Sequence, residues 1–173
     1  FQRPSWLKQT GRNILPILYL TFLAGNYFSL KIAGGVKTLA GNIDVDGDFE
    51  SSAETFDMNA NDISVAGNFT NSAGNVNFGN SNLTAYGIVW TGGTITATPG
   101  GNWDIGAGGV KLNGGAFIAT TGNFTRAGDW NMTGVTDFTN SSETIVFDGT
   151  GTYQITSAGS SFYNLSQTMP IVS

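Results

Sequence analysis

Apolar residues and glycines recur at 20-residue intervals over most of this sequence. Segments 43–49 and 63–69 both carry apolar residues at their first, third and seventh positions and a glycine at their fifth. Further steps of 20 reach Leu83, Ala85, Gly87 and Val89, then Trp103, Ile105 and Ala107, and a second series links Val110, Leu112 and Gly114 to Trp130, Met132 and Gly134. A fixed period of this length is typical of folds in which one structural unit stacks on the next.

Short runs of alternating apolar and polar residues lie between these positions. Each run ends at Gly, Asn, Asp or Ser, which favour turns, and helical spacing is absent after residue 40. The apolar pairs are Phe56 and Met58, Val76 and Phe78, Ile95 and Ala97, Phe117 and Ala119, Ile145 and Phe147, and Tyr153 and Ile155. The sequence therefore predicts an all-β fold, a parallel β-solenoid with coils of about 20 residues stacked about 4.8 Å apart. A sandwich of antiparallel hairpins would explain the short strands but not their constant spacing.

The composition excludes several kinds of chemistry. The chain has no histidine and no cysteine, so Ser-His-Asp and Cys-His nucleophiles, imidazole metal ligands, thiolate clusters and disulfides are ruled out. The groups left for catalysis are Lys111 and Arg126 with Asp104 and Asp129, which fall in different repeats without a dense acid cluster. We therefore expect a protein that is not an enzyme.

Charge is divided unevenly along the chain. Residues 1–43 carry five basic residues and no acidic one, whereas residues 44–173 carry 12 acidic residues against two basic ones. Nucleic acid is an improbable partner for the acidic part, because phosphate binding needs clustered cations. The opposite signs would favour head-to-tail attraction between copies of the chain, although a basic flank on a targeting segment explains the same pattern.

The first 25 residues form a separate, largely apolar segment ahead of the predicted solenoid at residues 26–173. It could cap its own solenoid, be donated as a strand to a neighbouring copy, or form a helix or membrane anchor as in type IV pilin-like subunits, whose processed chains also begin with Phe. The apolar stretch is too short to span a bilayer comfortably. The candidate assembly residues are Ile14, Leu15, Ile17, Leu18, Tyr19, Leu20, Phe22 and Leu23.

Four acidic residues alternate between positions 44 and 50. Asp44, Asp46, Asp48 and Glu50 would lie on one face of a strand, where their mutual repulsion could be relieved by a hard cation such as Ca²⁺. The spacing is not that of a complete EF-hand loop, since no Glu occupies the required later position. A solvated acidic face explains the same pattern.

Other patterns suggest surface contacts with glycans or ice. Thr94 with Thr96, and Thr150 with Thr152, could form a flat threonine array, although outward threonine is favoured on any strand. Tryptophans could stack on sugars, but the repeat places at least Trp103 and Trp130 inward. Possible glycosylation sites of the form Asn-x-Ser/Thr occur at Asn68, Asn82, Asn123, Asn131, Asn140 and Asn164.

Several segments resemble the Gly/Asn/Thr-rich repeats of large bacterial cell-surface and adhesin-like β-solenoid proteins. They are 67–72, 122–125, 144–156 and 161–165. The resemblance implies export, an extracellular or cell-surface location and a scaffold or attachment role, and it brings no catalytic residues. We therefore expect a structural subunit of an extracellular filament or surface adhesin, which assembles with copies of itself by end-to-end stacking or strand donation and contacts surface glycans. The alternative is a carbohydrate- or ice-binding module.

Overall fold

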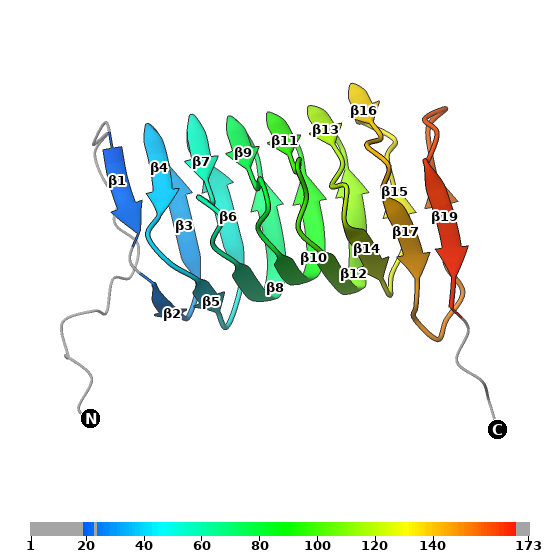
Figure 1. Ribbon diagram of the computed structural model, residues 1–173, viewed down its shortest axis with the longest axis horizontal. Coiled ribbons are helices and arrows are strands. Elements are labelled where there is room, and N and C mark those ends of the chain that lie inside the picture. The colour runs from blue at the N-terminus through cyan, green and yellow to red at the C-terminus, as the bar shows by residue number, and fades with distance from the viewer. Residues whose placement is uncertain (1–18, 23, 169–173) are drawn as a thin grey trace.

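The computed structural model describes residues 19–22 and 24–168, which form nineteen β-strands stacked into a rod with β1 at one end and β19 at the other (Figure 1). Every strand pair is parallel. The strands are β1 (Tyr19–Phe22), β2 (Gly25–Tyr27), β3 (Leu30–Ala33), β4 (Val36–Leu39), β5 (Ile43–Val45), β6 (Phe49–Ser52), β7 (Thr55–Asp57), β8 (Ile63–Asn71), β9 (Asn75–Asn77), β10 (Leu83–Trp90), β11 (Thr94–Thr96), β12 (Trp103–Leu112), β13 (Ala116–Ile118), β14 (Asn123–Arg126), β15 (Trp130–Asn131), β16 (Asp137–Thr139), β17 (Thr144–Phe147), β18 (Ile155–Thr156) and β19 (Asn164–Gln167). The predicted parallel β-solenoid is confirmed.

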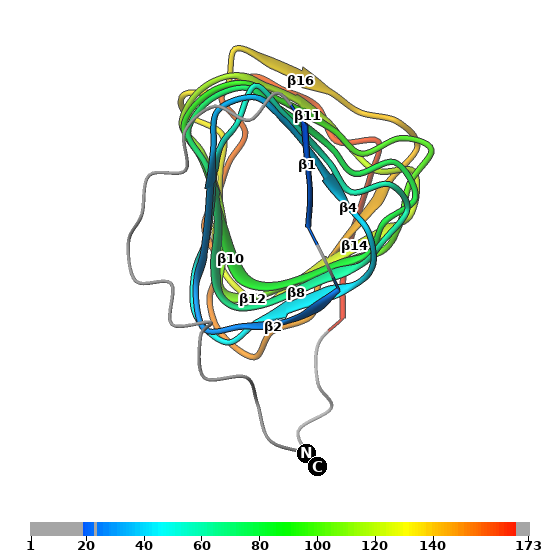
Figure 2. The ribbon, with the colours of Figure 1, turned by 90° about the vertical axis from the view of Figure 1, so that its left-hand side faces the viewer.

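The rod has three sides, and its cross-section is a rounded triangle (Figure 2). The first side is the sheet β1-β4-β7-β9-β11-β13-β16. The second side contains β2, β5, β14, β17 and β19, and the third contains β3, β6, β15 and β18. The long strands β8, β10 and β12 turn a corner and contribute to both, since β8 pairs with β5 through its first residues and with β6 through its last. Each coil therefore visits the three sides in turn, giving about seven coils and a rod roughly 30 Å long.

The chain winds as a right-handed coil. In Figure 2, where the N-terminal end faces the viewer, it runs clockwise from β1 through β2 and then along the side that carries β10. The spacing of stacked residues is 20 along the series Ile43, Ile63, Leu83 and Trp103. Elsewhere the spacing varies. Ile88, and not Val89 as the constant spacing predicts, stacks on Phe69, and Ile88 also stacks on Val110.

The extra residues are taken up at one corner. A register shift after Ala85 aligns Gly87 with Gly109, so Ala107 does not continue the series that the constant spacing predicts. It lies instead, exposed, in the corner of β12. Bulges of this kind absorb added residues without moving the strands on either side.

The interior is filled by stacked aromatic side chains. The ring centroids of Phe49 and Phe69 are 4.6 Å apart, and those of Phe78 and Trp103 are also 4.6 Å apart. Trp103 and Trp130 are 1% and 0% exposed, which confirms their predicted inward position. Alternation along each strand therefore sends mainly apolar residues inward, with Ser51, Asn71 and Arg126 as buried polar exceptions, and leaves the other polar residues on the three faces.

The first coil includes part of the N-terminal segment. β1 stacks on β4, with Tyr19 opposite Val36 and Phe22 opposite Leu39, and β2 stacks on β5. Strands therefore lie on both sides of the boundary predicted between residues 25 and 26. Among the candidate assembly residues, Ile14, Leu15, Ile17, Leu18 and Leu23 lie outside the described residues, whereas Tyr19, Leu20 and Phe22 belong to β1.

Candidate functional site

A ladder of side chains joins successive coils at the corner between the first and second sides. Oδ1 of Asn42 accepts a hydrogen bond from the backbone N–H of Asp62 at 2.9 Å, and Oδ1 of Asp62 accepts one from the N–H of Asn82 at 2.8 Å. The same contact joins Asn82 to Asn102 at 2.8 Å and Asn102 to Asn123 at 3.1 Å. The recurring Asn and Asp residues therefore satisfy backbone groups that a corner leaves outside the strand ladders.

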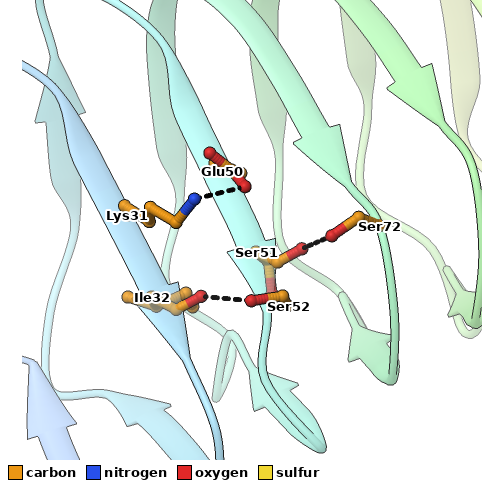
Figure 3. Close-up of polar contacts among 6 residues, drawn as sticks. All are labelled: Lys31, Ile32, Glu50, Ser51, Ser52 and Ser72. Carbon is orange, nitrogen blue, oxygen red and sulfur yellow. Dashed lines mark hydrogen bonds and ion pairs between the residues drawn. The ribbon is translucent and has the colours of Figure 1, made fainter. Parts of the chain in front are cut away.

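The third side is joined along the axis by polar contacts between neighbouring coils (Figure 3). Lys31 Nζ lies 2.7 Å from Glu50 Oε1, and Ser72 Oγ donates to the backbone carbonyl of Ser51 at 3.4 Å. The ion pair is largely exposed and contributes little to stability. These contacts join neighbouring coils of one chain, so the polar groups that make them are bound within the molecule.

Exposed large apolar side chains gather at the two ends of the rod. In the described residues they are Phe28, Tyr86, Ile155, Tyr163 and Leu165, at 84%, 50%, 44%, 59% and 52% exposure. Phe28 follows β2 in the first coil, and the last three follow β17 in the last one. Tyr86 lies on the side of the rod. Exposed apolar groups of this size mark interaction sites when they are grouped.

The C-terminal end contains a hollow of about 440 Å³. We call it the C-terminal hollow; its lining residues are Phe147, Gly151, Thr152, Tyr153, Ile155, Leu165, Ser166 and Gln167. It lies at the corner between the second and third sides, beyond the last strands of each. Ile155 and Leu165 stack on Trp130 and Ile145, which are interior residues. Their exposure therefore shows the interior opening to solvent at this end.

Both ends also carry unpaired strand edges. Among the described residues, β1, β2 and β3 each have a strand neighbour on one side alone, and so do β18 and β19 at the opposite end. The segment that follows β18 lies against β16, where the Asn140 amide donates to the carbonyl of Ser161 at 3.2 Å. Such edges present backbone N–H and C=O groups that can accept a further strand. In the described residues the unpaired strand edges thus lie at the two ends of the stack.

Arg126, one of the candidate catalytic groups, lies inside the rod. It stacks between Ile105 and Phe147 and is 0% exposed. Its Nη1 donates to the carbonyl of Gly128, its Cζ lies 3.7 Å from the ring centroid of Phe147, and Nε and Nη2 have no hydrogen-bond partner in the described residues. Burial lowers the pKa of the guanidinium to about 10. Its position 21 residues after Ile105 was the signal that places it inward.

The other candidate catalytic groups are not brought together. Lys111 is exposed on the third side, Asp104 is exposed on the second side, and Asp129 lies in the corner between β14 and β15. Asp104 Oδ1 accepts a hydrogen bond from Thr125 Oγ1 at 3.2 Å. Within residues 19–22 and 24–168, no ion pair joins Lys111 to either aspartate.

The four acidic residues do not share one strand. Asp44 belongs to β5 on the second side and Glu50 to β6 on the third, with Asp46 and Asp48 in the turn between them. Glu50 is paired with Lys31. In the part of the chain that the structure describes, no group of three or more Asp or Glu residues is placed to hold a metal ion.

The threonine pairs do not extend into an array. Thr94 and Thr96 face outward on β11, whereas Thr150 and Thr152 lie in the turn between β17 and β18. The residues stacked against the first pair are Asn75, Asn77, Ala116 and Ile118. Trp90, Trp103 and Trp130 are buried, so these three rings present no stacking surface to a sugar.

The six asparagines of the glycosylation motifs are exposed or half-buried. They are Asn68, Asn82, Asn123, Asn131, Asn140 and Asn164. The amide of Asn82 donates to Asp62 Oδ1 at 3.1 Å, and that of Asn140 donates to the carbonyl of Ser161 at 3.2 Å. A glycan attached at either nitrogen would have to be accommodated beside these contacts.

No known protein family, curated protein or solved structure matches this chain. In residues 19–22 and 24–168 no helix is long and apolar enough to span a membrane. The geometry of the rod and of its ends is therefore the basis on which a function can be proposed.

Proposed function

We propose that this protein is a non-enzymatic structural subunit of an extracellular filament or surface adhesin, and that its copies associate through the ends of the solenoid. The observation that carries this proposal is the position of the exposed apolar side chains. Four of the five in the described residues lie in the first or last coil, next to unpaired strand edges. Apolar contact and backbone pairing would therefore act on the same two surfaces.

The flanks of the rod favour contacts within the chain. The Asn and Asp ladder uses side-chain oxygens to bind the next coil, and strand edges on each side are paired except at the ends. If another coil were added at an end, the interior residues exposed there would be buried. Burial would stabilise the contact by roughly 25 cal/mol per Å² of apolar area. Stacking of this kind needs no catalytic group, which agrees with the lack of histidine and cysteine.

The extracellular or cell-surface location is supported by sequence resemblance alone. The Gly/Asn/Thr-rich segments are similar to those of bacterial surface and adhesin-like solenoid proteins, and a chain without cysteine needs no particular redox environment. Surface glycans are proposed as the substrate of attachment. The interrupted threonine columns and the buried tryptophans give no separate support to an ice- or carbohydrate-binding module.

Electron microscopy of the purified chain over a range of concentrations tests the association. We expect unbranched fibres one solenoid wide for the parent, and loss of fibres when Ile155→Lys and Leu165→Lys are combined, because two charges would replace apolar groups at the C-terminal end. The matched control is Tyr86→Lys, which changes an equally exposed side chain on the flank and should leave fibres intact. A parent that stays monomeric at every concentration overturns the proposal, as does equal loss in the control.

A further inference from the structure

We infer that the junction between copies is polar: the C-terminal end of one copy stacks on the N-terminal end of the next, and the second and third sides continue as parallel sheets. This inference rests on the proposed end-to-end association and adds its direction. A junction between two like ends would instead join the copies by a two-fold axis, whereas joining unlike ends repeats one step along a filament.

The direction follows first from the strands. All seventeen pairings in the described residues are parallel. Stacking unlike ends keeps every strand in the same direction across the junction. Stacking like ends would bring strands together in opposite directions, with the different hydrogen-bond spacing of an antiparallel pair. Continuing the existing geometry therefore requires unlike ends.

At the N-terminal end, the free backbone groups can be identified from the pairing of β2. Gly25 donates its N–H to the carbonyl of Asn42 at 3.2 Å, and the carbonyl of Tyr27 accepts from the N–H of Asp46 at 2.8 Å. Because alternate residues of a parallel strand bond to the same neighbour, the amide and carbonyl of Asn26 face the open edge.

At the C-terminal end, β19 shows the matching arrangement. Asn164 donates its N–H to the carbonyl of Glu143 at 3.2 Å, and Thr168 donates to the carbonyl of Phe147 at 2.9 Å. The intervening amide of Gln167 therefore faces the open edge. The second side thus ends in one edge at each end, and the two edges have the same strand direction.

The shapes of the two ends are also matched at one corner. Phe28 lies between β2 and β3, at the corner between the second and third sides, and it is 84% exposed. The C-terminal hollow lies at the same corner beyond β17 and β18, with Tyr153 and Leu165 in its lining. When copies are stacked along one axis with their sides aligned, the Phe28 corner of one copy faces the hollow of the other.

A second copy of the chain is the occupant that fits the C-terminal end. It offers a parallel strand edge at Asn26 for the edge at Gln167, and the exposed ring of Phe28 for the C-terminal hollow.

Two proline variants test the direction. Asn26→Pro blocks the N-terminal edge and Gln167→Pro blocks the C-terminal edge, and neither removes a donor from the chain's own ladder, since both amides face outward. Circular dichroism verifies the fold of each. Phe28→Asp and Leu165→Asp, at exposed side chains, provide a second pair of blocked ends that does not alter the backbone.

Each blocked variant is measured alone and in an equimolar mixture by size exclusion with light scattering, at concentrations where the parent forms fibres. We expect each variant alone to be monomeric and the mixture to form a heterodimer, because one free C-terminal end then meets one free N-terminal end. Dimers of either variant alone, or a mixture that stays monomeric, overturn the inferred direction while the fibres of the parent still support end-to-end association. A parent without fibres overturns the association itself.

Discussion

Replacing the buried guanidinium of Arg126 by an apolar side chain should stabilise the solenoid. Burial lowers its pKa from the ordinary value of an arginine to about 10. Since a tenfold change in an ionisation equilibrium corresponds to about 1.4 kcal/mol, the folded state disfavours the charged form by about 3 kcal/mol. The attraction between the guanidinium and the Phe147 ring, whose centroid lies 3.7 Å from Arg126 Cζ, offsets about 2 kcal/mol of this cost. We therefore expect Arg126→Met, which fills similar space, to raise the free energy of unfolding by about 1 kcal/mol.

Urea unfolding at several pH values measures this difference, followed by circular dichroism and by the fluorescence of tryptophan; the Trp130 ring lies 5.7 Å from the guanidinium. The pKa of Arg126 is lower in the folded state than in the unfolded state. As the pH rises through about 10, the folded chain therefore loses a proton that the unfolded chain still holds. The parent should therefore gain stability relative to Arg126→Met above that pH. Below it, the difference should be constant. Groups that do not interact with Arg126 titrate equally in both proteins, so the comparison reports on Arg126 together with its electrostatic partners Asp129, Tyr153 and Asp148.

Two results would refute this reasoning. One is a parent more stable than Arg126→Met by over about 1 kcal/mol at neutral pH, which would mean that the buried charge is compensated. The other is a difference that does not change with pH. Arg126→Ala serves as the control for lost packing and should be less stable than Arg126→Met by about 2 kcal/mol, because alanine leaves a cavity.

Three further substitutions test the stacked interior, the turns and the corner ladder. Phe69→Ala should lower the free energy of unfolding by about 3–5 kcal/mol, and Thr70→Ala, on the outward face, by less than about 0.5 kcal/mol, as measured by urea unfolding; equal losses would argue against the inward columns. Gly74→Ala should lower the midpoint temperature of thermal unfolding more than Gly79→Ala. Both glycines have positive φ, but only at Gly74 would an added Cβ meet a backbone carbonyl. Asn82→Ala should cost about 1 kcal/mol and speed hydrogen exchange of the next coil's amide, and unchanged exchange would contradict the ladder.

The solenoid could be predicted because its signal is repeated many times. The series from Ile43 to Trp103 keeps one register, so apolar residues at the same phase stack into one column. The series from Gly87 could not be extrapolated, because β12 inserts additional residues at its corner and Gly109, not Ala107, takes the stacked position. Constant spacing predicts the strands well and the corners poorly, since corners accept insertions.

The polar residues were harder to interpret from the sequence. Alternation from Asp44 to Glu50 resembles one strand, but Gly47 marks a corner where a Cβ would meet the backbone carbonyl of Phe28 at 2.7 Å. The chain turns there and the carboxylates separate. Arg126 was considered only as a candidate catalytic group, whereas its stacking on Ile105 places it inside the rod. The end surfaces could not be located from sequence at all, because exposure of Leu165 depends on which coil is last.

X-ray diffraction from aligned fibres of the parent chain tests the central claim most directly. If copies continue one stack of coils from end to end, strands lie across the fibre axis and their spacing gives a sharp reflection at about 4.8 Å along that axis. The same spacing between strands should continue across each junction between copies, so the reflection should remain sharp as fibres lengthen. A 4.8 Å reflection perpendicular to the axis would mean that the rods associate by their flanks, and the account would be wrong.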